Sequence, residues 1–266
     1  MFNFSVPCII GSWMRSIFTV FMLSVMIAAS TVMSLKAQEL PSNGPALEEF
    51  IKNYILENPQ VLIEALETFE RQQEAEQLAR QREMLGRSSA VLTQSEHQVI
   101  LGNPDGDVTL IEFFDYNCGF CRRTLPDVDR LVEEDPNLKI VLKEFPVLGE
   151  GSVEAARVAI AASKIDTEKY LELHRELLSA RGQVDRRTAM LLSERLGYDR
   201  EELEQMLDTG PINEAINEVY SIATNLGLSG TPTFIIGEEI LPGAVGYDVL
   251  KDKIDSMRRC GETVCS

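Results

Sequence analysis

The sequence has few basic residues. Its 25 lysines and arginines are outnumbered by 42 aspartates and glutamates, which gives a formal net charge of −17. Nucleic acids and anionic membrane surfaces are bound through basic faces, so this balance argues against both as partners. The acidity selects no partner by itself, because a solvated acidic surface explains it equally well.

Tryptophan and histidine are scarce. Trp13 is the one tryptophan, and His97 and His174 are the two histidines. Neither histidine is adjacent in sequence to a cysteine pair, so we expect both to be structural rather than to activate a thiol. Internal repeats are also missing, which argues against a repeat architecture.

An apolar run follows Arg15 near the N-terminus. The segment SIFTVFMLSVMIAASTVMSLKA is interrupted only by small and hydroxyl residues before Lys36. A basic residue ahead of such a run is typical of a secretory signal. We therefore expect residues 1–37 to be a signal peptide and the rest of the chain to be exported, with the periplasm as its location. An uncleaved membrane anchor is the alternative, because the run is nearly long enough to span a bilayer.

Cysteine is also rare, with five residues in the chain. Cys8 precedes the apolar run and is expected to be lost with it. The other four form two close pairs, Cys118 with Cys121 and Cys260 with Cys265. In an oxidising compartment an even count suggests disulfides, although two pairs could together hold a tetrahedral zinc ion. For the second pair the simplest expectation is a disulfide that closes a short loop, and a second redox or metal-binding pair is the alternative.

Residues 38–95 are expected to form a helical segment. The polar linker QELPSNGP comes first, and Asn58-Pro59 supplies a cap and a first-turn proline where two helices meet. Apolar residues recur at helical spacing on both helices, at Leu47, Phe50, Ile51, Tyr54 and Ile55, then at Leu62, Ala65, Leu66 and Phe69. So short a segment cannot form a core of its own. Its apolar stripe must pack on the main domain or on another copy of the chain, and we favour self-association.

The main domain is predicted over residues 96–266. Strand signals are found in VTLIEFFDY, LKIVLKEFPV, TPTFIIG and EEILPGAV, and the residues from about 150 to 227 are almost wholly helical. The helix CRRTLPDVDRLVEED joins the first two strands, and YDVLKDKIDSMRRC forms a last helix. The order βαβ, helical block, ββα indicates an α/β domain with a helical insertion.

The first cysteine pair lies where a strand gives way to a helix. Backbone N–H groups and the dipole at a helix N-terminus favour a thiolate at Cys118 over a thiol. Cys121 lies one turn inside the helix and is expected to be more buried. A CxxC that follows a strand within a βαβ unit is a strong redox signal. We therefore expect Cys118 to be the nucleophile and Cys121 the resolving residue of thiol–disulfide exchange, which requires no bound cofactor or metal.

Three stretches of the sequence resemble the DsbA family of exported thiol–disulfide oxidoreductases. They are IEFFDYNCGFC, the helical insertion and GLSGTPTFIIG, and the resemblance covers residues from about 98 to 257. It implies a thioredoxin fold with an inserted helical domain, preceded here by the N-terminal helical segment. It also implies that Pro232 is a cis-proline facing the cysteines and that Thr231 presents its backbone to the substrate.

The same resemblance implies that Glu112 is a buried acid beneath the cysteines, which exchanges protons with Cys121. A solvated glutamate on a half-exposed strand is the alternative. Lys143 is a weaker candidate, as a neighbour of that acid.

Departures from the family pattern bear on the direction of the reaction. Gly119 and Phe120 separate the cysteines, where oxidases of the family commonly have a histidine before the second cysteine. Thr231 is similar to the corresponding residue of disulfide isomerases. The N-terminal helical segment resembles that of ScsC-like proteins, which form homotrimers or homodimers. These features point to a milder oxidant that isomerises or reduces disulfides, and dithiol oxidation remains open.

The expected partners are exported proteins with thiols or disulfides and a membrane redox protein, with a homo-oligomer as the assembled form. The competing hypothesis is a metal-binding or chaperone-like exported protein that uses the same fold without catalysing exchange.

Overall fold

The computed structural model describes residues 44–207 and 209–265. The predicted signal peptide, with Cys8 and Trp13, lies outside this part of the chain. Within it, none of the helices is both long and apolar enough to cross a membrane.

The chain divides into two compact units that meet between Thr68 and Phe69. The first unit contains α2 (Gly44–Glu57) and the beginning of α3 (Gln60–Thr93). The two helices meet at Asn58-Pro59, as the sequence predicted, and the Asn58 amide donates a hydrogen bond to the Tyr54 carbonyl (2.9 Å). The division between the units falls inside α3. The boundary that the sequence predicts between the helical segment and the main domain, at residues 95 and 96, stays a prediction.

The apolar stripe of the first unit is open to solvent in the single chain. Its largest members, with exposed fractions between 36% and 57%, are Leu47, Phe50, Ile51, Tyr54, Leu62, Leu66 and Phe69. None of the residues of α2 is buried.

A mixed five-stranded sheet organises the second unit. In spatial order its strands are β1 (Val99–Gly102), β3 (Leu138–Glu144), β2 (Val108–Phe114), β4 (Thr233–Ile236) and β5 (Glu239–Pro242). The pair β2 and β3 is parallel, as a crossover through α4 (Gly119–Glu134) requires, and the other neighbours are antiparallel. The sequence did not predict β1, because a four-residue strand is too short to show a period.

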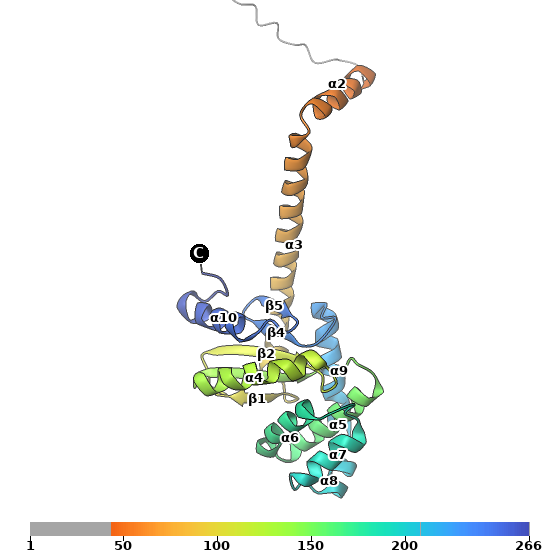
Figure 1. Cartoon of the computed structure of the whole chain (residues 1–266), viewed down its shortest axis with the longest axis vertical. Coiled ribbons are helices and arrows are strands. Elements are labelled where there is room, and N and C mark those ends of the chain that lie inside the picture. Colours follow the sequence, from red (N-terminus) through yellow and green to blue (C-terminus); the bar gives the residue numbers. More distant parts are fainter. Residues whose placement is uncertain (1–43, 208, 266) are drawn as a thin grey trace, which may run out of the picture. The chain divides into compact units, whose positions relative to one another are not determined.

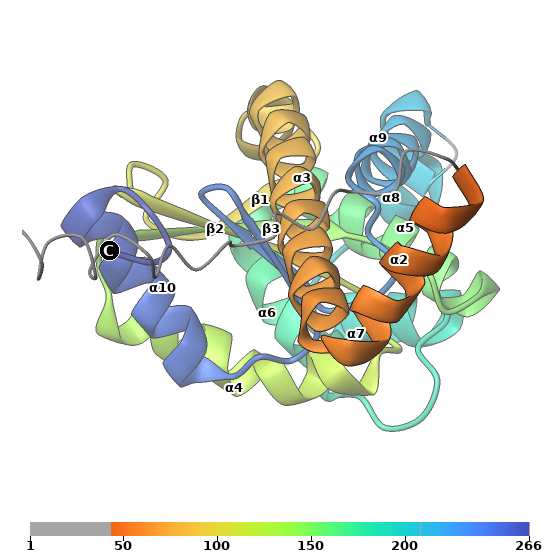
Figure 2. The ribbon, with the colours of Figure 1, turned by 90° about the horizontal axis from the view of Figure 1, so that it is seen from above.

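Helices cover both faces of this sheet. On one face α4 and α10 (Tyr247–Cys260) pack over a core that includes Leu110, Leu142 and Phe234. On the other face α9 (Gly210–Leu226) and the second half of α3 pack against Phe113, Val141 and Ile235. Figure 2 shows α9 and α4 on opposite sides of the strands. The arrangement is the predicted α/β thioredoxin fold, with the active-site helix on one face.

The helical insertion extends from α5 to α9. Before α9 it comprises α5 (Glu150–Ile165), α6 (Thr167–Ser179), α7 (Arg186–Arg195) and α8 (Arg200–Leu207). Figure 1 shows α5 to α8 gathered together beneath the sheet. Their limits are encoded locally: Asp166 accepts hydrogen bonds from the backbone N–H groups of the first turn of α6, and Gly227 ends α9 in the left-handed conformation (φ 67°).

Candidate active site

Cys118 caps the N-terminus of α4. Its backbone is extended (φ −77°, ψ 114°), and its carbonyl accepts the first bond of the helix from the N–H of Arg122 (3.1 Å). The Cys118 residue is 6% exposed and Cys121 is 0% exposed, so the second sulfur lies deeper than the first. Both are free thiols. This is the arrangement that the strand-to-helix position of the motif predicted.

The turn ahead of Cys118 is held by two side chains that sequence reasoning missed. Asp115 Oδ2 accepts hydrogen bonds from the backbone N–H groups of Val147 and Leu148 (2.8 and 3.0 Å). Asn117 exchanges two bonds with the Val184 backbone, 2.7 Å to its N–H and 2.8 Å to its carbonyl. These bonds fasten the turn to the connection after β3 and to the helical insertion, which fixes the Cys118 sulfur in space.

The loop before β4 faces the reactive sulfur. The Thr231–Pro232 peptide bond is cis, so the prediction made for Pro232 is confirmed. The Cys118 thiol donates a hydrogen bond to the Thr231 carbonyl (3.0 Å). The Pro232 carbonyl in turn accepts a bond from the Gly243 N–H (2.8 Å), which ties this loop to the segment after β5.

Glu112 is buried beneath the cysteines, with 3% of its surface exposed. It pairs with Leu142 and Phe234 on the neighbouring strands and so points to the face that α4 covers. Burial, reinforced by the charge of Asp129, raises the pKa of Glu112 to about 8. The alternative of a solvated glutamate is therefore wrong.

The electrostatic environment of Cys121 includes that acid. Burial raises the pKa of the Cys121 thiol well above its usual range, and the negative charges of Glu112 and Cys118 raise it further. Cys121 thus needs a base to become a nucleophile, and Glu112 is the buried carboxylate whose charge reaches it.

Lys143 is not a neighbour of Glu112. It pairs with Phe113, so its side chain leaves the opposite face of the sheet. There its ammonium donates to the Val91 carbonyl of α3 (2.9 Å) and lies 3.3 Å from Glu218 Oε1 on α9. Lys143 therefore anchors α3 and α9, and the expected contact was wrong because strand alternation puts adjacent residues on opposite faces.

The first turns of α4, beside the two cysteines, carry basic and apolar side chains. Gly119 to Arg122, the first turn of α4, includes no acidic residue. The Arg122 guanidinium donates to the carbonyls of Tyr116 (3.0 Å) and Gly182 (2.9 Å), which holds its charge near the helix N-terminus. Arg123 lies over the ring of Phe120, 4.2 Å from the centroid, and Phe120 is 55% exposed.

A second buried polar group lies beside the turn. Tyr116 and Tyr170 both donate to Glu144 Oε1 (3.0 and 2.9 Å), and burial raises the pKa of Glu144 to about 8. His174 packs edge-on against Phe114, and burial lowers its pKa to about 3. It is therefore neutral and buried, as expected of a structural histidine.

A groove opens beside the cis-proline. It has a volume of about 490 Å³ and includes Phe120, Leu228, Thr231, Pro232 and Ile240 among its lining residues. Gln81 of α3 also lines it, so the helix that begins in the first unit contributes to the surroundings of the site. Thr231, whose carbonyl accepts the hydrogen bond from the Cys118 thiol, is one of these lining residues, so the groove borders the loop that contacts the reactive sulfur.

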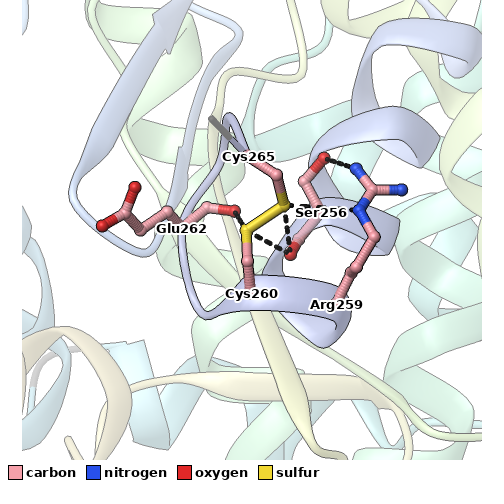
Figure 3. Close-up of a disulfide and its surroundings, with 5 residues drawn as sticks. All are labelled: Ser256, Arg259, Cys260, Glu262 and Cys265. Atoms are coloured by element: carbon pink, nitrogen blue, oxygen red, sulfur yellow. Dashed lines mark hydrogen bonds between the residues drawn. A yellow bond between two sulfur atoms is a disulfide. The ribbon is translucent and has the colours of Figure 1, made fainter. Parts of the chain in front are cut away.

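The second cysteine pair forms a disulfide between Cys260 and Cys265 (Figure 3), as the simplest expectation held. No cluster of three or more histidine, cysteine or acidic side chains suited to a metal ion is found in the described part of the chain.

Comparison with known proteins agrees with this geometry. The family model of the DSBA-like thioredoxin domain matches residues 109–255, which is more than half of the chain. The chain belongs to this family. Residues 46–76 match the N-terminal domain of the copper resistance protein ScsC, so the helical segment of this DSBA-like protein has a known counterpart.

Two solved structures illustrate the similarity. A thioredoxin-like oxidoreductase from Silicibacter pomeroyi is 37% identical, with a TM-score of 0.61 and coverage of 64% of this chain and 98% of that one. The catalytic domain of Proteus mirabilis ScsC is 27% identical (TM-score 0.59, 64% and 94% covered).

Among curated proteins, disulfide bond formation protein D of Bacillus subtilis is 23% identical over 168 residues, 59% of this chain and 76% of its own. Another relative, a Na⁺/H⁺ antiporter from Salinispora arenicola, is matched over 28% of its length.

Proposed function

We propose that this protein catalyses thiol–disulfide exchange on exported proteins, with Cys118 as nucleophile and Cys121 as resolving cysteine. The observation that carries the proposal is the position of the Cys118 sulfur, at the N-cap of α4 and 3.0 Å from the Thr231 carbonyl, with Cys121 buried behind it. A helix N-terminus stabilises a thiolate, and the thiolate is the attacking species.

The reductive half-reaction has two steps. The Cys118 thiolate attacks one sulfur of a substrate disulfide, the substrate S–S bond breaks, and the other substrate sulfur leaves as a thiolate that takes a proton from water. Cys121 then gives its proton to the Glu112 carboxylate and attacks the Cys118 sulfur. The mixed disulfide breaks, the second substrate thiolate leaves, and two electrons have passed from the cysteine pair to the substrate. Dithiol oxidation is the same sequence in reverse.

The groove beside Pro232 supports an extended peptide as substrate. Its apolar lining favours unfolded or partly folded segments over native surfaces. Thr231 borders both the groove and the Cys118 sulfur, so its backbone is in a position to orient the substrate disulfide.

Isomerisation or reduction is the direction that we favour. The residues between the cysteines are Gly119 and Phe120, and neither adds a charge that would stabilise the reduced form. Several copies of the site in one oligomer would suit the repeated attacks that reshuffling requires. The alternative is dithiol oxidation, with a membrane redox partner that accepts the electrons.

The exposed stripe of α2 and the first turns of α3 supports a homo-oligomer, a dimer or a trimer. Large apolar side chains open to solvent mark an interaction surface, and these side chains lie in the segment that matches the N-terminal domain of ScsC. Location in the periplasm is proposed from the N-terminal apolar run together with the periplasmic thioredoxin-like protein of Salmonella enterica, 28% identical, among the relatives.

Two activity assays run in parallel test the direction of the reaction. Reduction of insulin and refolding of scrambled ribonuclease are measured for the intact protein and for Ile51→Lys combined with Leu66→Lys, which disrupts the stripe. Isomerase activity that is lost on monomerisation, while insulin reduction persists, supports the proposal, and isomerase activity that is unchanged in the variant contradicts it. A deletion for the same purpose is best ended at Thr68, the last residue of the first unit, and must not reach Leu85 and Leu92 further along α3, which are buried. Tight binding of zinc or copper(I) to the CxxC without turnover would support the competing metal-binding hypothesis instead.

A further inference from the structure

The tail disulfide has no part in the exchange described above, and its surroundings are unlike those of the CxxC pair. Cys260 is the last residue of α10, and Gly261 reverses the chain in the left-handed conformation (φ 78°) so that Cys265 returns to it. Cys260 is exposed and Cys265 is half-buried. A thiolate from solvent can therefore reach this S–S bond.

The two sulfurs lie in different electrostatic environments. Two carbonyl oxygens lie close to the Cys260 sulfur, that of Ser256 at 3.3 Å and that of Glu262 at 3.6 Å. Cys260 also sits at the C-terminus of α10, where the helix dipole is negative. Both features disfavour a negative charge on Cys260.

Cys265 faces a positive charge instead. The Arg259 Nε–H donates to the Cys265 sulfur (3.4 Å), and the Nη2 of the same guanidinium donates to the Ser256 hydroxyl (3.0 Å). Figure 3 shows Arg259 reaching this sulfur from its own turn of α10 while the Glu262 carbonyl lies beside the other one. The Ser256 carbonyl is also 3.6 Å from the Cys265 sulfur, so the two sulfurs differ in the guanidinium beside Cys265 and the Glu262 carbonyl beside Cys260.

We propose that Cys260–Cys265 is an exchangeable disulfide, a second redox site at which an external thiolate attacks the Cys260 sulfur and Cys265 leaves as the thiolate beside Arg259. The sulfur that carries charge more easily is the better leaving group. The attacking sulfur forms a mixed disulfide with Cys260, the Cys260–Cys265 bond breaks, and its electron pair stays on Cys265. A second thiolate, from the same dithiol or from another thiol molecule, then releases Cys260 and completes the two-electron reduction.

The reactant is a thiolate from another molecule, and the chemistry fits two sources. One is a small thiol such as glutathione, and the other is Cys118 of a second copy of this chain, which is 6% exposed. Their shared chemistry is an attacking thiolate, so the proposal does not depend on the proposed function of the CxxC pair.

The test uses the full chain with Cys118→Ser and Cys121→Ser, in which the tail pair is the one disulfide of the exported part. The oxidised protein is exposed to reduced glutathione and quenched with N-ethylmaleimide. A tryptic peptide that begins at Cys260 is then fragmented to locate each label. We expect glutathione on Cys260 and maleimide on Cys265, in at least fivefold excess over the reverse. Glutathione mainly on Cys265, or an S–S bond that resists reduction throughout, overturns the proposal.

The role of Arg259 is tested in the same background. We expect Arg259→Gln to slow the attack of glutathione about fivefold or more and Arg259→Lys to restore most of the rate, since a structural role alone would not follow the charge. Arg181→Gln, an exposed arginine outside the tail, is the matched control and should leave the rate unchanged. Equal rates for Arg259→Gln and the parent contradict the proposal.

A last arm separates the two sources. The oxidised variant is mixed either with glutathione or with the reduced intact protein at the same thiol concentration. Faster reduction by the intact protein identifies Cys118 of another copy as the donor, and faster reduction by glutathione identifies a small thiol. No reduction by either contradicts the proposal without touching the function assigned to the CxxC pair.

Discussion

The two cysteine pairs of this protein lie at opposite ends of helices. Cys118 caps the N-terminus of α4, whereas Cys260 ends α10. The first position favours a thiolate through the helix dipole and free N–H groups, and the second opposes it. Two cysteines of the same chemistry thus differ in how readily they carry a negative charge, because one lies at the start of a helix and the other at the end.

The second cysteines of the two pairs, Cys121 and Cys265, also have different neighbours. Cys121 is fully buried above Glu112, a carboxyl with a raised pKa that can take up or release a proton. Cys265 instead has the permanent charge of Arg259 and needs no proton acceptor. One pair is built for cycles of oxidation and reduction coupled to a proton, and the other for attack from one side by an external thiol.

The largest expected effect is on catalytic activity, which should depend on the CxxC pair and not on the tail pair. Cys118→Ser should reduce insulin-reduction activity by roughly a thousandfold or more, because the nucleophile of a covalent mechanism is removed. Cys260→Ser combined with Cys265→Ser should leave the activity within about twofold. Circular dichroism of both variants serves as the folding control. Comparable losses in the two would make the tail pair part of the same catalytic site.

The second prediction concerns the proton on Cys121. Release of substrate by Cys121 requires the Glu112 carboxylate, so its rate should rise with pH through about 8, the raised pKa of Glu112. Glu112→Gln should slow this step roughly 100-fold and flatten its pH profile. The decay of a mixed disulfide with a fluorescent peptide measures it by stopped flow. Glu133→Gln, an exposed residue of α4, is the control, and an unchanged profile in Glu112→Gln would remove the acid from the mechanism.

A third prediction follows from the cost of burying that charge. The folded-state pKa of Glu112 lies above the unfolded value, so the folded protein loses stability as pH rises from about 4.5 to about 8. Glu112→Gln should therefore raise the free energy of unfolding by up to about 5 kcal/mol at pH 9 and change it little at pH 4. Urea unfolding at both pH values checks this. Equal effects at the two values would mean that the charge is not what burial penalises.

The smallest effect belongs to the tail. A disulfide that closes so short a loop contributes about 2 kcal/mol at most, and Cys260→Ser combined with Cys265→Ser should lower the free energy of unfolding by no more than that. Among the described residues, the contacts of the two sulfurs include no titrating acid, so the loss should be the same at pH 5 and pH 8. A loss that changes between the two values would show that the tail is coupled to a titrating group.

Much of the active site could be predicted from the sequence because its signals are local. The strand IEFF, the turn and the helix of the CxxC follow one another along the chain, so the position of Cys118 at a helix N-terminus could be read directly. The position of Glu112 beneath the cysteines came from the family resemblance. The cis-proline at Pro232 came from the family resemblance, since a Thr-Pro-Thr sequence by itself indicates only a turn.

The rest depends on contacts between residues far apart in the sequence. Asn117 reaches Val184 across 67 positions, and Lys143 reaches Val91 across 52. Neither pairing has a local signal, so the fastening of the active-site turn and the anchoring of α3 could not be predicted. The wrong neighbour assigned to Lys143 shows the same limit, because the sequence does not give the register of β2 and β3, which pairs Lys143 with Phe113 and Glu112 with Leu142.

The most direct measurement is the alkylation rate of each cysteine of the reduced protein as a function of pH, followed by mass spectrometry of the separate peptides. We expect Cys118 to be alkylated far faster at pH 7 than a free cysteine, while Cys121 stays unreactive until the protein unfolds. A Cys118 that reacts no faster than free cysteine at that pH would contradict it, and the chain would then be a scaffold with two thiols rather than an oxidoreductase.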